Sequence, residues 1–150
     1  MTSHSRHRLC VVIALATALS CRSSKATLEL EKRTPAAADG LLIQDLGIET
    51  LGGVFTPLLR SGQSVPCQVT ETFSTAADNQ DNVEVRLFRG NAKLARDATP
   101  VGRFVVEGLP KAPRGIPNVA ITFSVTADGA IVVTARETSG HPVRLRRGDG

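Results

Sequence analysis

The stretch "NVAITFSVTADGAIVVTARE", residues 118–137, decides the fold expected of this 150-residue chain. Before Asp128-Gly129, large apolar residues alternate with small or polar ones (Val119, Ile121, Phe123 and Val125), and after it Ile131, Val133 and Ala135 return on one face. This period of two is typical of β-strands that bury one face. The Asp-Gly pair supplies the positive φ angle that a tight turn between two strands requires. The stretch therefore predicts a β-hairpin.

Short apolar runs separated by Gly, Pro, Asn and Asp continue through the chain from Leu41 onward. This pattern predicts an all-β protein, a sandwich or a barrel, without a helix of useful length after residue 41. Pro57 restricts its strand to a sheet edge or a bulge, because proline cannot donate a ladder hydrogen bond. Besides the hairpin, strands are expected in "GGVFTPLL" (52–59), "NVEVRLFRG" (82–90), "VGRFVVEGL" (101–109) and "HPVRLRR" (141–147).

Composition and charge argue against nucleic-acid binding. The formal charge is +4, and Arg6 and Arg8 belong to the N-terminal segment, so the rest of the chain is only weakly basic. Trp and Tyr are absent, which leaves few aromatic rings on which bases could stack. A hydrophobic content of 41% suits one domain with a core of Val, Leu and Ile.

The first 21 residues have the pattern of an export signal. A basic start precedes the apolar run "LCVVIALATAL" (9–19), which is too short to span a bilayer comfortably. The run ends in "ALSC" at Cys21, which resembles the cleavage box of bacterial lipoproteins, whose cysteine carries a diacylglyceryl anchor. We therefore expect a location in the cell envelope or periplasm, with lipidation at Cys21. Ordinary cleavage after "ATA" and a cytoplasmic protein with a misassigned start are the alternatives.

Residues 22–40 are polar and Ala-rich, and we expect a flexible tether there, with a short helical stretch around Leu28–Lys32. The domain itself is expected at residues 41–147. It contains one cysteine, Cys67, and no CxxC or His-rich pair, so we expect no metal site. A bridge from Cys67 to Cys21 is conceivable only if Cys21 carries no lipid.

Three motifs, "LGIETLGGVFT" (46–56), "FSTAADNQ" (73–80) and "APRGIP" (112–117), together resemble the peptide-binding β domain of the seventy-kilodalton heat-shock chaperones of the DnaK type. The similarity extends from Leu46 to Ala135 without an evident gap. It implies an antiparallel β-sandwich of two four-stranded sheets. It also implies that loops at one end of the sandwich form a channel for an extended peptide.

The resemblance further implies an apolar pocket in this channel. Phe73 and Val83 match the walls of a central pocket for one apolar side chain, and Ile48, Val85 and Val119 match its further lining. Without the three motifs, valines that alternate along strands would be interpreted as ordinary core residues.

The remaining site residues implied by the resemblance lie in the loops. Leu51 and Ala76 match the two side chains that close an arch over the bound peptide backbone. Thr50, Ser74 and Gln80 match positions that offer hydrogen bonds to the peptide. Such residues also favour turns, where they bond to their own backbone.

The expected function is passive binding of extended hydrophobic segments of unfolded proteins. The chain is not expected to be an enzyme, since Asp78 and Asp81 have neither a nucleophile nor a partner histidine. No cofactor is expected, because ATP would require a separate nucleotide-binding domain. In the family, the positions of Asp78 and Arg114 pair with a helical lid, which is not recognisable here. The alternatives are a non-binding structural envelope lipoprotein and a fragment of a full ATP-dependent chaperone.

Overall fold

The expected hairpin is present in the computed structural model as strands β9 (Asn118–Val125) and β10 (Ile131–Glu137), which pair from Val125 opposite Ile131. Gly129 has a φ of 82°, as the turn requires. The backbone N–H of Thr126 donates to the carbonyl oxygen of Ala130 at 2.9 Å and closes the loop. The predicted hairpin is therefore confirmed.

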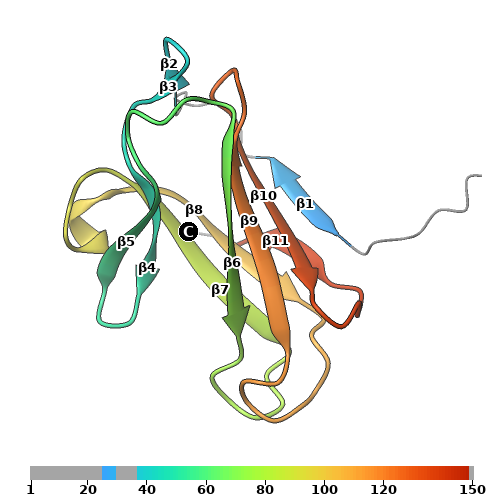
Figure 1. Ribbon diagram of the computed structural model, residues 1–150. Helices are drawn as coiled ribbons and strands as arrows, with labels where there is room; N and C mark the ends of the chain where they lie inside the picture. Colours follow the sequence, from blue (N-terminus) through green and yellow to red (C-terminus); the bar gives the residue numbers. More distant parts are fainter. Residues whose placement is uncertain (1–24, 30–36, 149–150) are drawn as a thin grey trace, which may run out of the picture.

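The structure describes residues 25–29 and 37–148 (Figure 1). In this part of the chain the only helical element is a 3₁₀ turn at Ala95–Asp97. The remaining strands are β1 (Ala26–Glu29), β2 (Ala37–Ala38), β3 (Leu41–Leu42), β4 (Leu46–Thr50), β5 (Val54–Leu59), β6 (Cys67–Ser74), β7 (Asn82–Arg89), β8 (Thr99–Glu107) and β11 (Arg144–Arg147).

The strands form two main antiparallel sheets. One sheet has four strands in the order β1, β10, β9, β6, and the other has five in the order β11, β8, β7, β4, β5. Strands β2 and β3 form a separate two-stranded sheet. The predicted all-β antiparallel sandwich is confirmed, but one sheet has five strands instead of the expected four. Strand β1 lies beside β10 at one edge of the four-stranded sheet, and β11 lies beside β8 at one edge of the five-stranded sheet.

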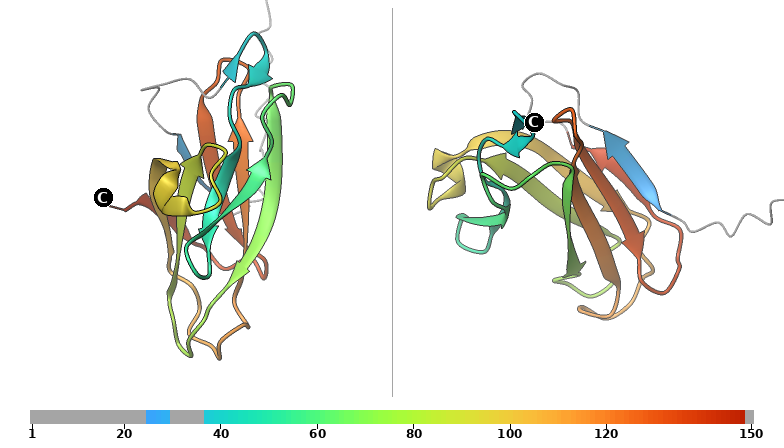
Figure 2. Two further views of the ribbon diagram at one scale, coloured as in Figure 1. Left: turned by 90° about the vertical axis from the view of Figure 1, so that its left-hand side faces the viewer. Right: turned by 45° about the horizontal axis from the view of Figure 1, so that its top comes forward.

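The two main sheets pack through their apolar faces (Figure 2). Phe104 from β8 and Phe123 from β9 are 1% and 0% exposed, so each sheet contributes a buried ring. Burial of an apolar side chain of this size contributes about 1.5–3 kcal/mol relative to exposure. Together with the buried valines, leucines and isoleucines around them, these rings hold the sheets together.

Strand β1 replaces the helical stretch expected around Leu28–Lys32. Leu28 lies opposite Val133 of β10 and is partly buried against the core, so the helical expectation is wrong for Leu28 and Glu29. The cause is tertiary: the edge of β10 offers unpaired N–H and C=O groups, and pairing with them outweighs a weak local preference. The rest of that stretch, and the expected export signal with Cys21, lie outside the described residues.

Strand β6 was not among the predicted strands, although it pairs with β9 along its whole length from Cys67 opposite Val125. Its sequence alternates only weakly, because Glu71 stands where a third apolar residue would complete the pattern. The strand lies at the edge of its sheet, and most of its side chains are exposed or partly buried. The weak pattern therefore reflects an edge position.

Pro57 lies at a bulge in the edge strand β5, which confirms both positions predicted for it. The register between β4 and β5 shifts at Leu46 and Gly47, and Gly47 lies opposite Pro57. A Cβ atom added to Gly47 would lie 2.3 Å from the carbonyl oxygen of Thr56. Glycine is therefore required at this position by the close approach of the neighbouring backbone.

We predict that Gly47→Ala lowers the free energy of unfolding by about 3 kcal/mol, because the two backbones must separate. Chemical denaturation followed by circular dichroism would measure this loss. The control is Gly62→Ala, where φ is 81° and a Cβ would meet nothing within 4 Å. There we expect a loss of about 1 kcal/mol from backbone strain alone. Equal losses in the two variants would contradict the steric account.

A buried carboxylate holds the turn that follows β10. Glu137 is 3% exposed, and its Oε2 accepts hydrogen bonds from the Ser139 backbone N–H at 2.8 Å, the Ser139 hydroxyl at 2.5 Å and the His141 backbone N–H at 3.1 Å. Burial acts to raise the pKa of Glu137, but these hydrogen bonds outweigh it, and the pKa lies below the ordinary value of 4.5. The folded state therefore favours the ionised form.

This shift predicts a pH-dependent contribution of Glu137 to stability. Because the pKa is lower in the folded state, the contribution is present above pH 4.5 and is lost as the pH falls through the folded-state value. Glu137→Gln should therefore lower the free energy of unfolding at pH 7 and have a smaller effect at pH 3. Denaturation of both proteins at the two pH values would test this, and an effect that grows toward pH 3 would contradict it.

Candidate functional site

Three connections point toward one end of the sandwich, the lower end in Figure 1: the β4–β5 turn (51–53), the β6–β7 loop (75–81) and the β8–β9 loop (108–117). The β6–β7 and β8–β9 loops lie side by side, whereas the β4–β5 turn lies apart from them and is bonded to the β7–β8 connection, where the N–H of Ala95 donates to the carbonyl oxygen of Gly53 at 2.9 Å. The β6–β7 loop carries the chain from one main sheet to the other, since β6 and β7 belong to different sheets. Each of the three motifs of the sequence contains all or part of one of these connections.

The β6–β7 and β8–β9 loops are joined by hydrogen bonds. The backbone N–H of Gly115 donates to the carbonyl oxygen of Thr75 at 3.0 Å and to its hydroxyl at 3.2 Å. The N–H of Asn79 donates to the carbonyl oxygen of Ala112 at 2.8 Å, and the N–H of Arg114 donates to the Asp78 carboxylate at 2.9 Å. Asp78 and the backbone of Arg114 thus bond to each other, and Asp78 has a structural role here.

Gln80 fixes the conformation of the β6–β7 loop. Its Oε1 accepts hydrogen bonds from the N–H groups of Ala76 and Ala77 at 3.0 and 3.1 Å, and its Nε2 donates to the carbonyl oxygen of Asn82 at 2.6 Å. The Gln80 amide, expected to contact a peptide, therefore bonds within its own loop in this structure. It positions Ala76 relative to the start of β7.

The apolar residues expected to form the pocket lie in one buried cluster. Ile48, Val83, Val85 and Val119 are between 0% and 6% exposed, and Phe73 is partly buried against them. Phe73 on β6 lies directly opposite Val119 on β9. The structure thus brings together residues from both sheets beneath the loop end, and Phe73 is the one among these five that is partly exposed.

Leu51 and Ala76, the expected arch residues, are both exposed. Leu51 is 100% exposed, so its side chain makes no contact that would close an arch with Ala76. The turn that carries Leu51 contains Gly52 and Gly53, with φ angles of 83° and 74°. The backbone there adopts a conformation that favours glycine, and it presents Leu51 to solvent.

Thr50 and Ser74, the other two expected hydrogen-bonding residues, bond to neighbouring parts of the chain. The Thr50 hydroxyl shares a 2.8 Å hydrogen bond with the Thr56 hydroxyl across β4 and β5. The Ser74 hydroxyl donates to the carbonyl oxygen of Pro117 at 2.7 Å. Both side chains fix the ends of their strands next to the loops.

Sequence reasoning assigned no role to Ile116, which is 63% exposed in the third connection. The sequence could have indicated it, because a large apolar residue stands at the end of a loop rich in proline and glycine. Leu51 and Ile116 together give the loop end exposed apolar surface. No group of three or more His, Cys, Asp or Glu side chains suited to a metal occurs among the described residues.

Cys67, the cysteine that the structure describes, is a free thiol that is partly buried, and burial raises its pKa. In residues 25–29 and 37–148 we find no helix with the length and hydrophobicity needed to cross a membrane.

Sequence comparisons relate this chain to known proteins. Residues 32–144 match the family model described as Hsp70 protein. The chaperone protein dnaK of Cyanidioschyzon merolae (strain NIES-3377 / 10D) is 45% identical over 94 residues, which cover 63% of this chain and 16% of that protein. The chaperone protein dnaK of Cyanidium caldarium is 46% identical over 92 residues, which cover 61% of this chain and 15% of that protein.

The chain thus has the β-sandwich of a chaperone family, and it belongs to the Hsp70 family. It spans about one sixth of the length of these two relatives, which are 16% and 15% covered.

We predict that Gln80→Ala loosens the β6–β7 loop without unfolding the sandwich. The variant loses three hydrogen bonds in an exposed loop, so the free energy of unfolding should fall by about 1 kcal/mol. Amide hydrogen exchange at Ala76 and Ala77 should become faster, since Gln80 accepts from both N–H groups. Gln68→Ala, on the exposed side of β6, is the control. Unchanged exchange at both alanines would show that Gln80 does not hold the loop.

Proposed function

We propose that this domain binds extended hydrophobic segments of unfolded polypeptides at the loop end of the sandwich. The observation that carries the proposal is the exposed Leu51 at the same end as the apolar cluster of Phe73 and Val83, in a chain of the Hsp70 family. A single exposed leucine is ordinary on a protein surface. Leu51 supports the proposal through its position, because it matches a residue that closes the arch over a bound peptide in the family that the chain resembles.

The chemistry of the site suits ligands of varied sequence. An extended peptide has unpaired N–H and C=O groups at each residue, and loop backbone can bond to them whatever the side chains are. One apolar side chain of the ligand would be buried near Phe73, which would contribute about 1.5–3 kcal/mol. After association costs, we expect dissociation constants on the order of micromolar or weaker.

We further propose that binding by this domain is passive and follows mass action, without a cofactor held by the domain itself. ATP-driven control would need a nucleotide-binding domain. Attachment to a membrane through Cys21, with the domain in the cell envelope or periplasm, is part of the same proposal. It rests on the sequence pattern of residues 1–21.

Fluorescence anisotropy of a labelled Leu-rich heptapeptide, titrated with the full chain, would test the binding proposal. We expect saturable binding that Leu51→Asp weakens about tenfold, because a carboxylate would replace the exposed apolar side chain beside the bound peptide. Leu51 is 100% exposed, so this substitution should leave the fold intact.

Ile43→Asp is the matched control, since Ile43 is an exposed apolar residue beside β3, near the other end of the sandwich. It should leave the affinity within about twofold of the unaltered chain. A second variant, Val83→Phe, fills the apolar cluster and should abolish binding if circular dichroism shows that it folds. Equal weakening by Leu51→Asp and Ile43→Asp, or no binding by the folded chain, would contradict the proposal. The latter result would favour a structural role.

A further inference from the structure

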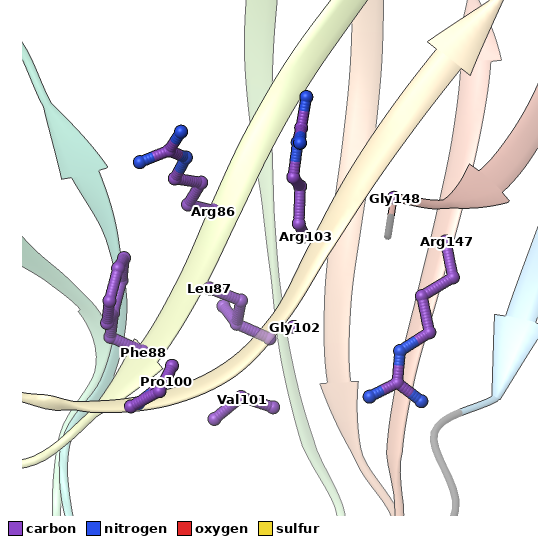
Figure 3. A pocket seen from close by; sticks show the side chains of 9 residues that line it. All are labelled: Arg86, Leu87, Phe88, Pro100, Val101, Gly102, Arg103, Arg147 and Gly148. Atoms are coloured by element: carbon purple, nitrogen blue, oxygen red, sulfur yellow. The ribbon is translucent and has the colours of Figure 1, made fainter. Parts of the chain in front are cut away.

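A hollow of about 490 Å³ lies beside the second half of β7 and the first half of β8 (Figure 3). Arg86 and Arg103 project on one side of it, and Arg147 lies across it from Phe88. Val83 and Val85 of β7 are buried, while Glu84 and Arg86 alternate with them and are exposed. Arg86, and Arg103 opposite it on β8, therefore belong to the face of the sheet that points away from the apolar cluster. Arg147 lies on the edge strand β11, opposite Phe104. None of the residues that line the hollow belongs to the loops of the proposed peptide site.

The hollow carries more positive than negative charge. Arg103 donates to Glu84 at 2.5 Å and Arg86 donates to it at 3.2 Å, so one carboxylate lies between two guanidinium groups. The hydrogen bond from Arg103 is the main cause that keeps the pKa of Glu84 below its ordinary value. A second carboxylate, Glu49, lies 3.5 Å from Arg86. Arg147 forms no ion pair with any residue that the structure describes.

The guanidinium groups of Arg86 and Arg103 are accessible to solvent and are also held in place. The side chains of Arg86 and Arg103 are 54% and 41% exposed although both bond to Glu84. Each comes from a strand of the sheet, which fixes its starting point. Planar guanidinium groups pair well with carboxylates, because two parallel N–H donors match two carboxylate oxygens.

Apolar side chains form the other part of the hollow. The β-bulge between Leu87 and Phe88 sets Phe88 opposite Pro100 of β8, and Val101 follows beside them. Phe88 and Val101 are only partly buried. A ligand that used the whole hollow would therefore need apolar atoms as well as negative charge.

We propose that this hollow binds a segment of another polypeptide in which acidic side chains flank an apolar side chain. The acidic groups would pair with Arg86, Arg103 and Arg147, and the apolar group would contact Phe88 and Pro100. A volume of about 490 Å³ accommodates one or two side chains. Its concave form suits an inserted side chain better than the plane of an anionic bilayer, and its apolar part gives inorganic phosphate nothing to contact.

The test uses the full chain and the labelled peptide Gly-Asp-Leu-Asp-Phe-Asp-Gly, with anisotropy as the readout. We expect saturable binding that weakens as the salt concentration rises. Arg147→Gln should weaken it about fivefold and the double variant Arg86→Gln/Arg147→Gln more than about tenfold, as charge-assisted hydrogen bonds are lost. Arg136→Gln, which removes an exposed arginine from β10 of the other main sheet, should change the affinity less than about twofold.

Several results would overturn the proposal. The first is no binding of the acidic peptide. The second is that a peptide with lysine in place of each aspartate binds as tightly as the acidic peptide. The third is that Arg136→Gln weakens binding as much as Arg147→Gln does. Displacement of the acidic peptide by excess Leu-rich heptapeptide would assign it to the loop end instead. Phosphatidylglycerol vesicles that bind through these arginines while the peptide does not would assign the arginines to a lipid surface. If the acidic peptide binds and the Leu-rich peptide does not, the proposed function fails while the proposal for the hollow is supported. The two proposals can therefore fail separately.

Discussion

The hydrogen bonds between residues 75–81 and 109–115 are the constraint on which the loop end depends. The chain must cross from β6 in one main sheet to β7 in the other, and the backbone groups of the crossing need partners. The β8–β9 loop supplies them. Because the crossing begins just after Phe73 and ends just before Val83, the same bonds set the positions of two residues expected to line the pocket.

This arrangement explains why the β6–β7 loop is so polar. Thr75, Asp78 and Gln80 use their side chains to hold the loop and its neighbour in place. A preformed loop reduces the ordering cost of binding. Under the proposed function, exposed apolar side chains at this end, among them Leu51 and Ile116, would contact the ligand.

Much of the fold could be predicted from the sequence, because β7 and β9 each bury one face and alternate accordingly, and the Asp128-Gly129 turn joins β9 to β10. The position of Pro57 followed from its missing N–H group. Strand β6 was not predicted, because an edge strand needs little apolar alternation. Strand β1 was not predicted either, because its pairing with β10 is a long-range contact that the sequence of Ala26–Glu29 does not encode locally. The grouping of the apolar site residues followed from motif resemblance. The internal hydrogen bonds of Ser74 and Gln80 depend on neighbours distant in sequence or on loop geometry, which no local pattern specifies.

The central claim is that extended apolar peptides bind at the loop end, and methyl-resolved NMR of the full chain titrated with a Leu-rich heptapeptide would test it most directly. The account predicts saturable shifts at the methyl groups of Leu51, Val83 and Ile116, with little change at Ile43 and Val133. Absence of shifts at saturating peptide, or shifts concentrated at Ile43 or along β10, would contradict it.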